Sequence, residues 1–252
     1  MSDQKQMGLW GLIKKISGKT SGLENLWDNA HFVLADVPLD RREAKKVLPL
    51  GLWPSDPPLG TLFIVDYTKT SFTVPYHEAA MLIHVRTPLG SGLHCCWMVV
   101  DDDTAMIYGR ELLGYPKKMA QFEFQELDGN IRASVTRRGV KVMDMDATRG
   151  KLQTPPSPVF DFKTFNAGAM GQFFIISPIW LFRPREVIHE SYAAEVKLTL
   201  NISDSDPLSR LVAGEPRNGR IVVMDIPGSK YNLPVGIAGV NWFANTFYLR
   251  FR

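Results

Sequence analysis

Short runs of apolar and β-branched residues, separated by turn residues, fill the middle of the chain. Runs of this kind predict strands, and they cover residues 61–67, 79–85, 94–101, 105–108, 121–127, 131–136, 140–147 and 195–202. The Asp128-Gly129-Asn130 turn joins two of them as a hairpin. This spacing predicts a mainly β (α+β) fold, with a largely antiparallel sheet closed into a barrel or sandwich and a few peripheral helices.

Helical signals are fewer. A short helix is predicted over residues 40–48, because Asp40 is a suitable N-cap, Glu43 follows three residues later and Pro49 ends the helix. The Pro- and Gly-rich residues 50–60 predict a loop.

The first part of the chain contains a second helical pattern. In residues 7–16 apolar side chains recur at helical spacing beside two lysines. A helix on a membrane surface is one interpretation, but two interior glycines weaken it. We therefore expect residues 1–28 to form a peripheral N-terminal helical segment packed on the body or on a neighbouring subunit. Without a repeat or a long linker, residues 1–252 are predicted to form a single domain.

Composition excludes several classes of protein. The 252 residues are 45% hydrophobic and 22% charged, which is typical of a globular chain. A formal net charge of +3 is too small and too scattered for a nucleic-acid partner. No apolar stretch reaches the length of a membrane span or of a secretory signal. The two cysteines are adjacent, so no disulfide framework is expected and a cytoplasmic location is predicted.

Neither a metal nor a cofactor is predicted. His77-Glu78 and His189-Glu190 are possible ligands, but no His-x-x-x-His spacing or cysteine cluster accompanies them. The glycine patterns of nucleotide-binding loops are absent from the sequence.

The strongest candidate for chemistry is the pair Lys117-Lys118. Apolar residues flank the pair on both sides, and Pro116 restricts the backbone before it. Two ammonium groups in an apolar stretch are costly, and both burial and a neighbouring cation lower a lysine pKa. A neutral amine is a nucleophile for carbonyl carbons. The alternative interpretation of this pair is that both lysines are solvated charges on the surface.

The segment around this pair resembles the active-site segment of the acetoacetate decarboxylase-like superfamily. The similarity comprises Asp101-Asp102-Asp103-Thr104, Gly109-Arg110-Glu111-Leu112 and Tyr115-Pro116-Lys117-Lys118. Two further stretches are similar in the same order, Pro75-Tyr76-His77-Glu78 and Val187-Ile188-His189-Glu190-Ser191-Tyr192. The resemblance spans roughly residues 30–211.

The resemblance implies a fold and a mechanism. The fold would be a closed, cone-shaped β-barrel with the lysine in its apolar interior, assembled as a homo-oligomer. Lys117 would form a Schiff base, Lys118 would lower the pKa of its neighbour, and Glu78 would line the site. Activation of a lysine by desolvation or by a neighbouring cation is the accepted explanation for acetoacetate decarboxylase.

Three more residues are candidates for substrate binding. Arg110 and Glu111 either enter the site or form an internal ion pair that holds the lysine segment in place. Tyr115 either faces the pocket or packs behind it.

The sequence departs from the family at two positions. Decarboxylases carry an arginine near the N-terminus for the substrate carboxylate, and the matching stretch here is Asn29-Ala30-His31-Phe32. A second family glutamate is replaced by Phe63 when residues are counted back from Glu78 without gaps. These losses predict slow or absent release of carbon dioxide from acetoacetate.

Three functions follow from this pattern, in order. The first is a Schiff-base-forming carbon–carbon lyase of the decarboxylase type acting on a small keto acid. The second is an aldolase-dehydratase that condenses pyruvate with an aldehyde co-substrate through a lysine enamine. The third is a non-catalytic barrel that binds an apolar ligand.

Overall fold

The computed structural model describes residues 25–160, 163–168 and 177–251. The strands are β1 (Trp27–Pro38), β2 (Trp53–Pro54), β3 (Leu59–Thr70), β4 (Tyr76–Thr87), β5 (Gly90–Val100), β6 (Lys117–Met119), β7 (Gln121–Leu127), β8 (Asn130–Arg137), β9 (Val140–Leu152), β10 (Lys163–Ala167), β11 (Ser177–Leu200) and β12 (Arg217–Ala238). The helices are α2 (Arg41–Val47), α3 (Asp103–Leu113), α4 (Val240–Phe251) and a 3-10 turn, η1 (Leu208–Arg210).

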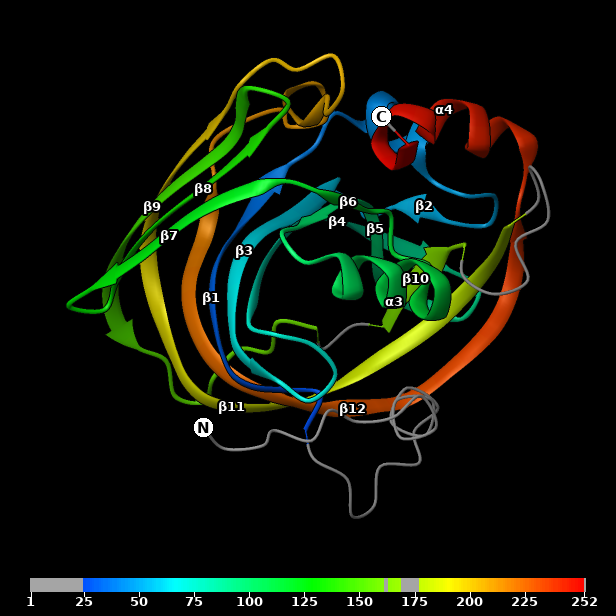
Figure 1. Cartoon of the computed structure of the whole chain (residues 1–252). Coiled ribbons are helices and arrows are strands. Elements are labelled where there is room, and N and C mark those ends of the chain that lie inside the picture. The colour runs from blue at the N-terminus through cyan, green and yellow to red at the C-terminus, as the bar shows by residue number, and fades with distance from the viewer. Residues whose placement is uncertain (1–24, 161–162, 169–176, 252) are drawn as a thin grey trace.

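One large sheet contains all the strands, and its main path runs β10-β5-β4-β3-β1-β12-β11-β9-β8-β7. Strand β10 pairs with β5 on one side and also with β11, so the hydrogen-bonded path leads back to β10. Figure 1 shows the strands curving around α3, with the β7–β9 strands extending to one side. The prediction of a mainly β fold with few helices is confirmed.

Most pairings between the described strands are antiparallel, as the sequence predicted, but the sheet is mixed. Strand β5 pairs in parallel with both β6 and β10. A parallel pair needs a crossover connection, and α3 provides it between β5 and β6. This helix, which the sequence did not predict, lies inside the curved sheet (Figure 1).

The predicted strand over residues 105–108 is wrong, because these residues belong to α3. At the N-cap of α3, the carboxylate of Asp102 accepts a hydrogen bond from the backbone N–H of Ala105. Gly114 ends the helix in a left-handed conformation with φ of 72°. A four-residue apolar run does not distinguish a strand from a helix by its period.

The hairpin turns and the first helix agree with the sequence. Asp128 and Gly129 both have positive φ, and so do Arg138 and Gly139, as two-residue hairpin turns require. Asp40 caps α2 through the amides of Arg42 and Glu43.

The predicted N-terminal helical segment lies mostly outside the described residues. Trp27 and Asp28 already belong to β1, so the segment does not extend to residue 28. In the described part of the chain no helix is long and apolar enough to cross a bilayer.

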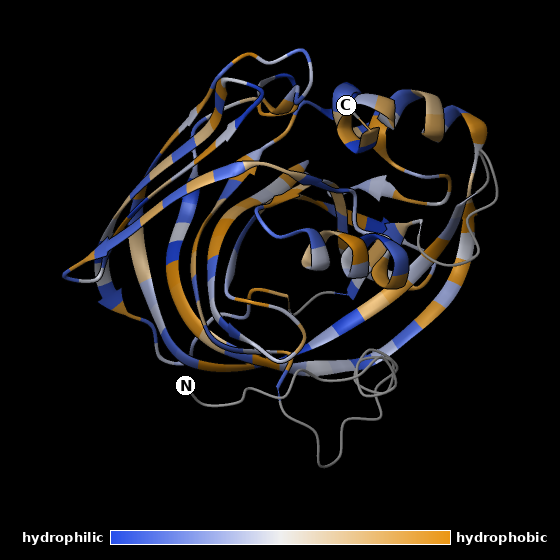
Figure 2. Cartoon of the chain, in the orientation of Figure 1, coloured by the Kyte–Doolittle hydropathy of each residue, from blue (hydrophilic) through white to orange (hydrophobic). Residues whose placement is uncertain are grey.

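Apolar side chains bury both faces of the central strands. Along β4 the even-numbered Glu78, Ala80 and Leu82 face one side, and the odd-numbered residues face the other. Figure 2 shows the resulting apolar stretches along these strands. Strands buried on both faces read as continuous apolar runs.

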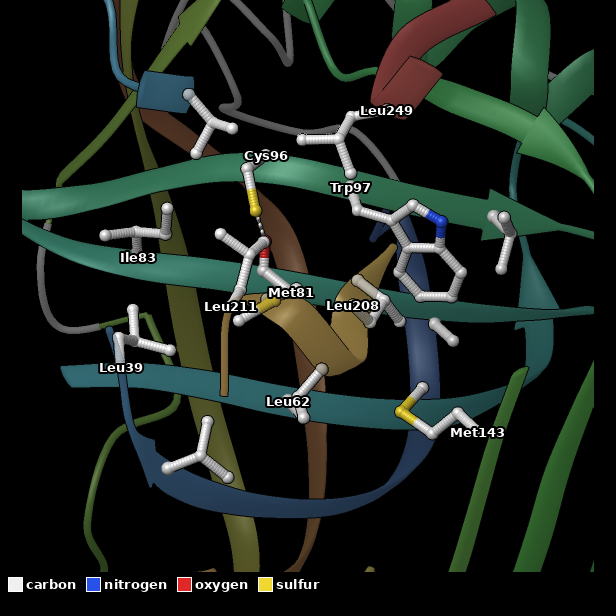
Figure 3. Close-up of a cluster of buried hydrophobic side chains, with 14 of the residues drawn as sticks. Leu39, Leu62, Met81, Ile83, Cys96, Trp97, Met143, Leu208, Leu211 and Leu249 are labelled. Carbon is white, nitrogen blue, oxygen red and sulfur yellow. Dashed lines mark hydrogen bonds between the residues drawn. The ribbon is translucent and has the colours of Figure 1, made fainter. Parts of the chain in front are cut away.

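Each face of these strands contributes to its own cluster of buried apolar side chains. The cluster on the side of α3, called the cavity-side cluster below, includes Phe32, Phe63, Met98, Tyr115 and Phe182. The opposite-face cluster packs β3–β5 against β8, β9, η1 and α4, and Figure 3 shows its Trp97, Met143, Leu208 and Leu249.

Candidate active site

The short strand β6 sends its two lysines to opposite faces of the sheet. It pairs in parallel with β5, so that Lys117 lies beside Met98 and Lys118 beside Val99. Met98 belongs to the cavity-side cluster and Val99 to the opposite-face cluster. Alternation along a strand therefore separates the two ammonium groups, although both are buried, at 4% and 6% exposed.

Lys117 meets Glu78 inside the sheet. Its Nζ lies 2.5 Å from Oε2 of Glu78, and both side chains are about 5% exposed. The hydroxyl of Tyr67 donates to the other oxygen of Glu78 over 3.5 Å. The amine also lies 5.6 Å from the ring centre of Tyr76. A buried carboxylate beside a buried amine can take up and return its proton.

Helix α3 forms one wall of this site. Its residues Ala105, Tyr108, Gly109 and Leu113 recur at helical spacing and line the cavity that contains the amine. Gly109 allows the close contact of Lys117 with α3, because a Cβ at that position would lie 2.4 Å from Cε of Lys117. The lysine side chain thus rests directly on the helix backbone.

These groups line a cavity of about 50 Å³ that opens to solvent. Aromatic and aliphatic side chains form most of its wall: Leu26, Trp27, Tyr67, Phe72, Met98, Ala105, Tyr108, Leu113, Tyr115, Phe160, Phe182, Pro184 and Ile226. Glu78 and Lys117 are the charged residues of the described lining. A concave apolar site with a few convergent polar groups is the usual form of a small-molecule site.

Two phenols in the cavity, Tyr67 and Tyr115, remain neutral donors. Burial raises the pKa of Tyr67 well above its ordinary value, and Glu78 adds to the effect. Burial also raises the pKa of Tyr115, whose hydroxyl lies 3.4 Å from Oγ1 of Thr164. Both hydroxyls therefore keep their protons at neutral pH.

Lys118 belongs to a different network. Its Nζ lies 2.5 Å from Oδ1 of Asp206, which also accepts from Nε1 of Trp97. Arg137 binds the other carboxylate oxygen at 2.8 Å. Burial lowers the pKa of Lys118 to about 8, although the Asp206 carboxylate acts in the opposite direction. The buried carboxylate of Asp206 therefore pairs with both Lys118 and Arg137 on the face of the sheet away from the cavity.

The carboxyl of Asp206 stays ionised in this network. Burial raises the pKa of Asp206, but Lys118 and the hydrogen bonds from Trp97 and Arg137 outweigh it, so the pKa falls below its ordinary value. Asp206 is fully buried and comes from the loop before η1.

Of the three predicted substrate-binding residues, the structure brings Tyr115 alone to the cavity wall. Arg110 and Glu111 follow Gly109 in α3, so the 100° turn per residue directs them to other faces of the helix. Arg110 donates to the backbone carbonyl of Lys117 over 2.9 Å, and Glu111 is exposed. The alternative interpretation, in which Arg110 holds the lysine segment, agrees with this contact, although its partner is a carbonyl.

At the two places where the sequence departs from the family, the side chains on the cavity side of the strands are apolar. Ala30 and Phe32 of β1 are fully buried in the cavity-side cluster, and Phe63 of β3 packs edge-on against Phe32 and Phe160. None of them lines the cavity itself.

Sequence reasoning missed several residues of the site. Tyr67, Tyr108 and Gly109 contribute to the wall, and Asp206 holds Lys118. Gly109 stands in the recognised segment, and a glycine at a buried helix position signals close approach. Asp206 is 88 residues from Lys118 in sequence, and no local signal connects the two.

Most of the chain matches the sequence model of a known family. The sequence model of acetoacetate decarboxylase (ADC) matches residues 17–232. Among curated proteins, none matches the chain in sequence.

Several solved structures share the fold. A structure of acetoacetate decarboxylase has a TM-score of 0.75 at 19% identity, covering 92% of this chain and 99% of its own. Acetoacetate decarboxylase from Legionella pneumophila has a TM-score of 0.70 at 14% identity, covering 94% and 98%. The enduracididine biosynthesis enzyme MppR, complexed with pyruvate, has a TM-score of 0.69 at 14% identity, covering 82% and 88%. At these identities the likeness shows a common fold.

Proposed function

Because the chain belongs to the acetoacetate decarboxylase family, we propose that it is a carbon–carbon lyase that forms an imine between Lys117 and a small keto acid. The observation that carries this proposal is the amine of Lys117, 2.5 Å from Glu78, in a cavity that is otherwise apolar. A lysine in an apolar pocket is an activated nucleophile for carbonyl carbon.

The residues present account for each step of a decarboxylation. Glu78 takes a proton from Lys117, and the neutral amine adds to the keto carbon and expels water as the imine forms. The protonated imine accepts the electron pair of the bond to the carboxylate, and carbon dioxide leaves. Glu78 has by then returned its first proton to the departing water, and after taking another proton from solvent it protonates the enamine at carbon. Water then releases the ketone and the free amine.

The apolar wall favours loss of a carboxylate. A carboxylate held among aromatic rings without a fixed cation is poorly solvated, whereas carbon dioxide and the enamine are neutral. Because most of the lining is aromatic or aliphatic, we favour a 3-oxo acid with an apolar substituent as the substrate, which agrees with the slow turnover of acetoacetate expected from the sequence.

The aldol reaction on pyruvate is the second candidate. The close approach of Glu78 to Lys117 supports it, because the same carboxylate can remove a proton from the methyl group next to the imine. An aldehyde would then add to the enamine. This reaction keeps the pyruvate carboxylate, which in the described cavity would have the tyrosine hydroxyls as its donors besides Lys117.

Reductive trapping tests the imine. The protein is incubated with a 3-oxo or a 2-oxo acid and borohydride, and peptide mapping locates the added mass. We expect the label on Lys117, none in Lys117→Met, and normal labelling in Lys197→Met, which removes an exposed lysine of β11. A label on another lysine, or on none with any keto acid, refutes the proposal.

A second experiment separates the two reactions. Carbon dioxide release from acetoacetate and from 3-oxo-3-phenylpropanoate is compared with methyl proton exchange of pyruvate in heavy water, with Lys117→Met as the blank for spontaneous decarboxylation. Fast release from the phenyl compound supports the decarboxylase. Pyruvate exchange followed by aldehyde addition, without carbon dioxide release, favours the aldol reaction.

A further inference from the structure

The last turn of α4 lies against the segment that carries the reactive lysine. The final four carbonyls of a helix have no partner within the helix. In α4 two of them, those of Tyr248 and Arg250, accept hydrogen bonds from Lys118 at 3.3 Å and Arg110 at 3.2 Å. Cations at this position also suit the negative end of the helix dipole.

Arg110 joins α4 to Lys117 directly. The same Nη1 that donates to the carbonyl of Arg250 donates to the carbonyl of Lys117 over 2.9 Å. The guanidinium lies 5.5 Å from the ring centre of Phe251, the last residue of the helix. One planar cation thus connects the backbone of β6 with the end of α4.

Arg250 reaches the same segment from the other side. It is 4% exposed, and its Nη1 lies 3.5 Å from the carbonyl of Gly114, three residues before Lys117. Its guanidinium also lies over the ring of Trp242 at 5.3 Å. Gly168 leaves room for it, since a Cβ there would be 2.7 Å from Nη2.

An anchor of this kind is needed because β6 is weakly held by the sheet. It has three residues, and in the described chain its strand pairing is with β5 alone. The neighbouring Leu249 contributes packing, and Figure 3 shows it beside Trp97 in the opposite-face cluster.

We propose that α4 is a clamp on the catalytic strand, and that Arg110 and Arg250 are positioning residues that hold the backbone of Lys117 so that its amine meets Glu78. The role in catalysis rests on the proposed function, whereas the clamp itself does not. A backbone displacement of about 1 Å at a reacting group lowers a rate by about a hundredfold.

Hydrogen exchange measured by mass spectrometry tests the clamp without any substrate. Arg250→Met should speed exchange in the peptide covering residues 114–120 by about tenfold and leave the β7–β9 peptides unchanged. Arg250→Lys, which keeps a donor, should recover part of the protection. Asn245→Ala, on the exposed face of α4, is the matched control and should behave as wild type.

Borohydride trapping with the same variants tests positioning. Arg250→Met and Arg110→Met should lower the trapping rate at saturating keto acid by about tenfold, with a smaller change in half-saturation. Arg110→Met decides the matter if Arg250→Met does not fold. Unchanged exchange over residues 114–120 in a folded variant overturns the clamp, and faster exchange with normal trapping overturns the positioning role. Absence of trapping in wild type refutes the proposed function, while exchange still decides the clamp.

Discussion

Gly109→Ala is the sharpest test of how the site is built. A Cβ at this position would lie 2.4 Å from Cε, 2.6 Å from Cδ and 3.0 Å from Nζ of Lys117. Carbon atoms in contact prefer about 3.5–4.0 Å, so the lysine side chain must move by roughly 1 Å. The flexible side chain can move without breaking the fold, but its amine then leaves Glu78.

The expected result separates activity from stability. A misplacement of about 1 Å lowers the rate by about a hundredfold. Alanine is a better helix former than glycine by about 1 kcal/mol, so the free energy of unfolding should stay within about 1 kcal/mol of wild type. An activity loss without a stability loss identifies displacement of the lysine as the cause.

The assay is a time course of borohydride trapping under single-turnover conditions, together with urea denaturation. Glu111→Ala lies on the exposed side of the same helix and is the control, with expected wild-type rates. Trapping in Gly109→Ala within threefold of wild type refutes the idea that the lysine needs the bare helix backbone, whereas an unfolded variant contradicts the expected stability.

The remaining predictions concern charge. Because Lys118 faces away from Lys117 and pairs with Asp206, Lys118→Met should leave the pH midpoint of trapping unchanged, and a shift to higher pH would restore the neighbouring-charge mechanism. Glu78→Gln should lower turnover about 10²-fold or more while trapping persists, and normal turnover would make Glu78 structural. Burial lowers the pKa of His94 to about 4. The unfolded chain therefore binds the extra proton below about pH 6.5, and stability should fall by about 3 kcal/mol between there and pH 4. In His94→Gln the free energy of unfolding should not fall in this way between pH 6.5 and pH 4. An equal fall in this variant would contradict the role of His94.

The sequence predicts most of the sheet because its strands are locally encoded. The β7–β8 hairpin alternates cleanly and carries a turn with two positive φ angles, so its bounds follow from the residues alone. The prediction fails for α3, where a short apolar run depends on a cap at Asp102 to become helical. The sequence patterns also did not predict β1, β12 and α4.

The sequence likewise identifies some residues of the site and misses others. The segment around Lys117 is recognisable, and Glu78 follows from the resemblance, which the structure supports by bringing the two together. The direction of Lys118 could not be foreseen, because it depends on β6 being a strand with two buried faces. The wall of the cavity comes from strands far apart in the chain, whose contacts leave no local signal.

The position of β1 has a consequence for how the protein folds. It lies between β3 and β12, and Val33 pairs with Ile64 on one side and with Ile221 on the other. The second partner follows 188 residues later in the 252-residue chain, so closing the sheet depends on a contact between distant parts of the sequence. Until β12 arrives, β1 presents an unpaired edge to other chains. Folding should therefore be slow and prone to aggregation before closure, and the lysine pocket should form only in its last phase.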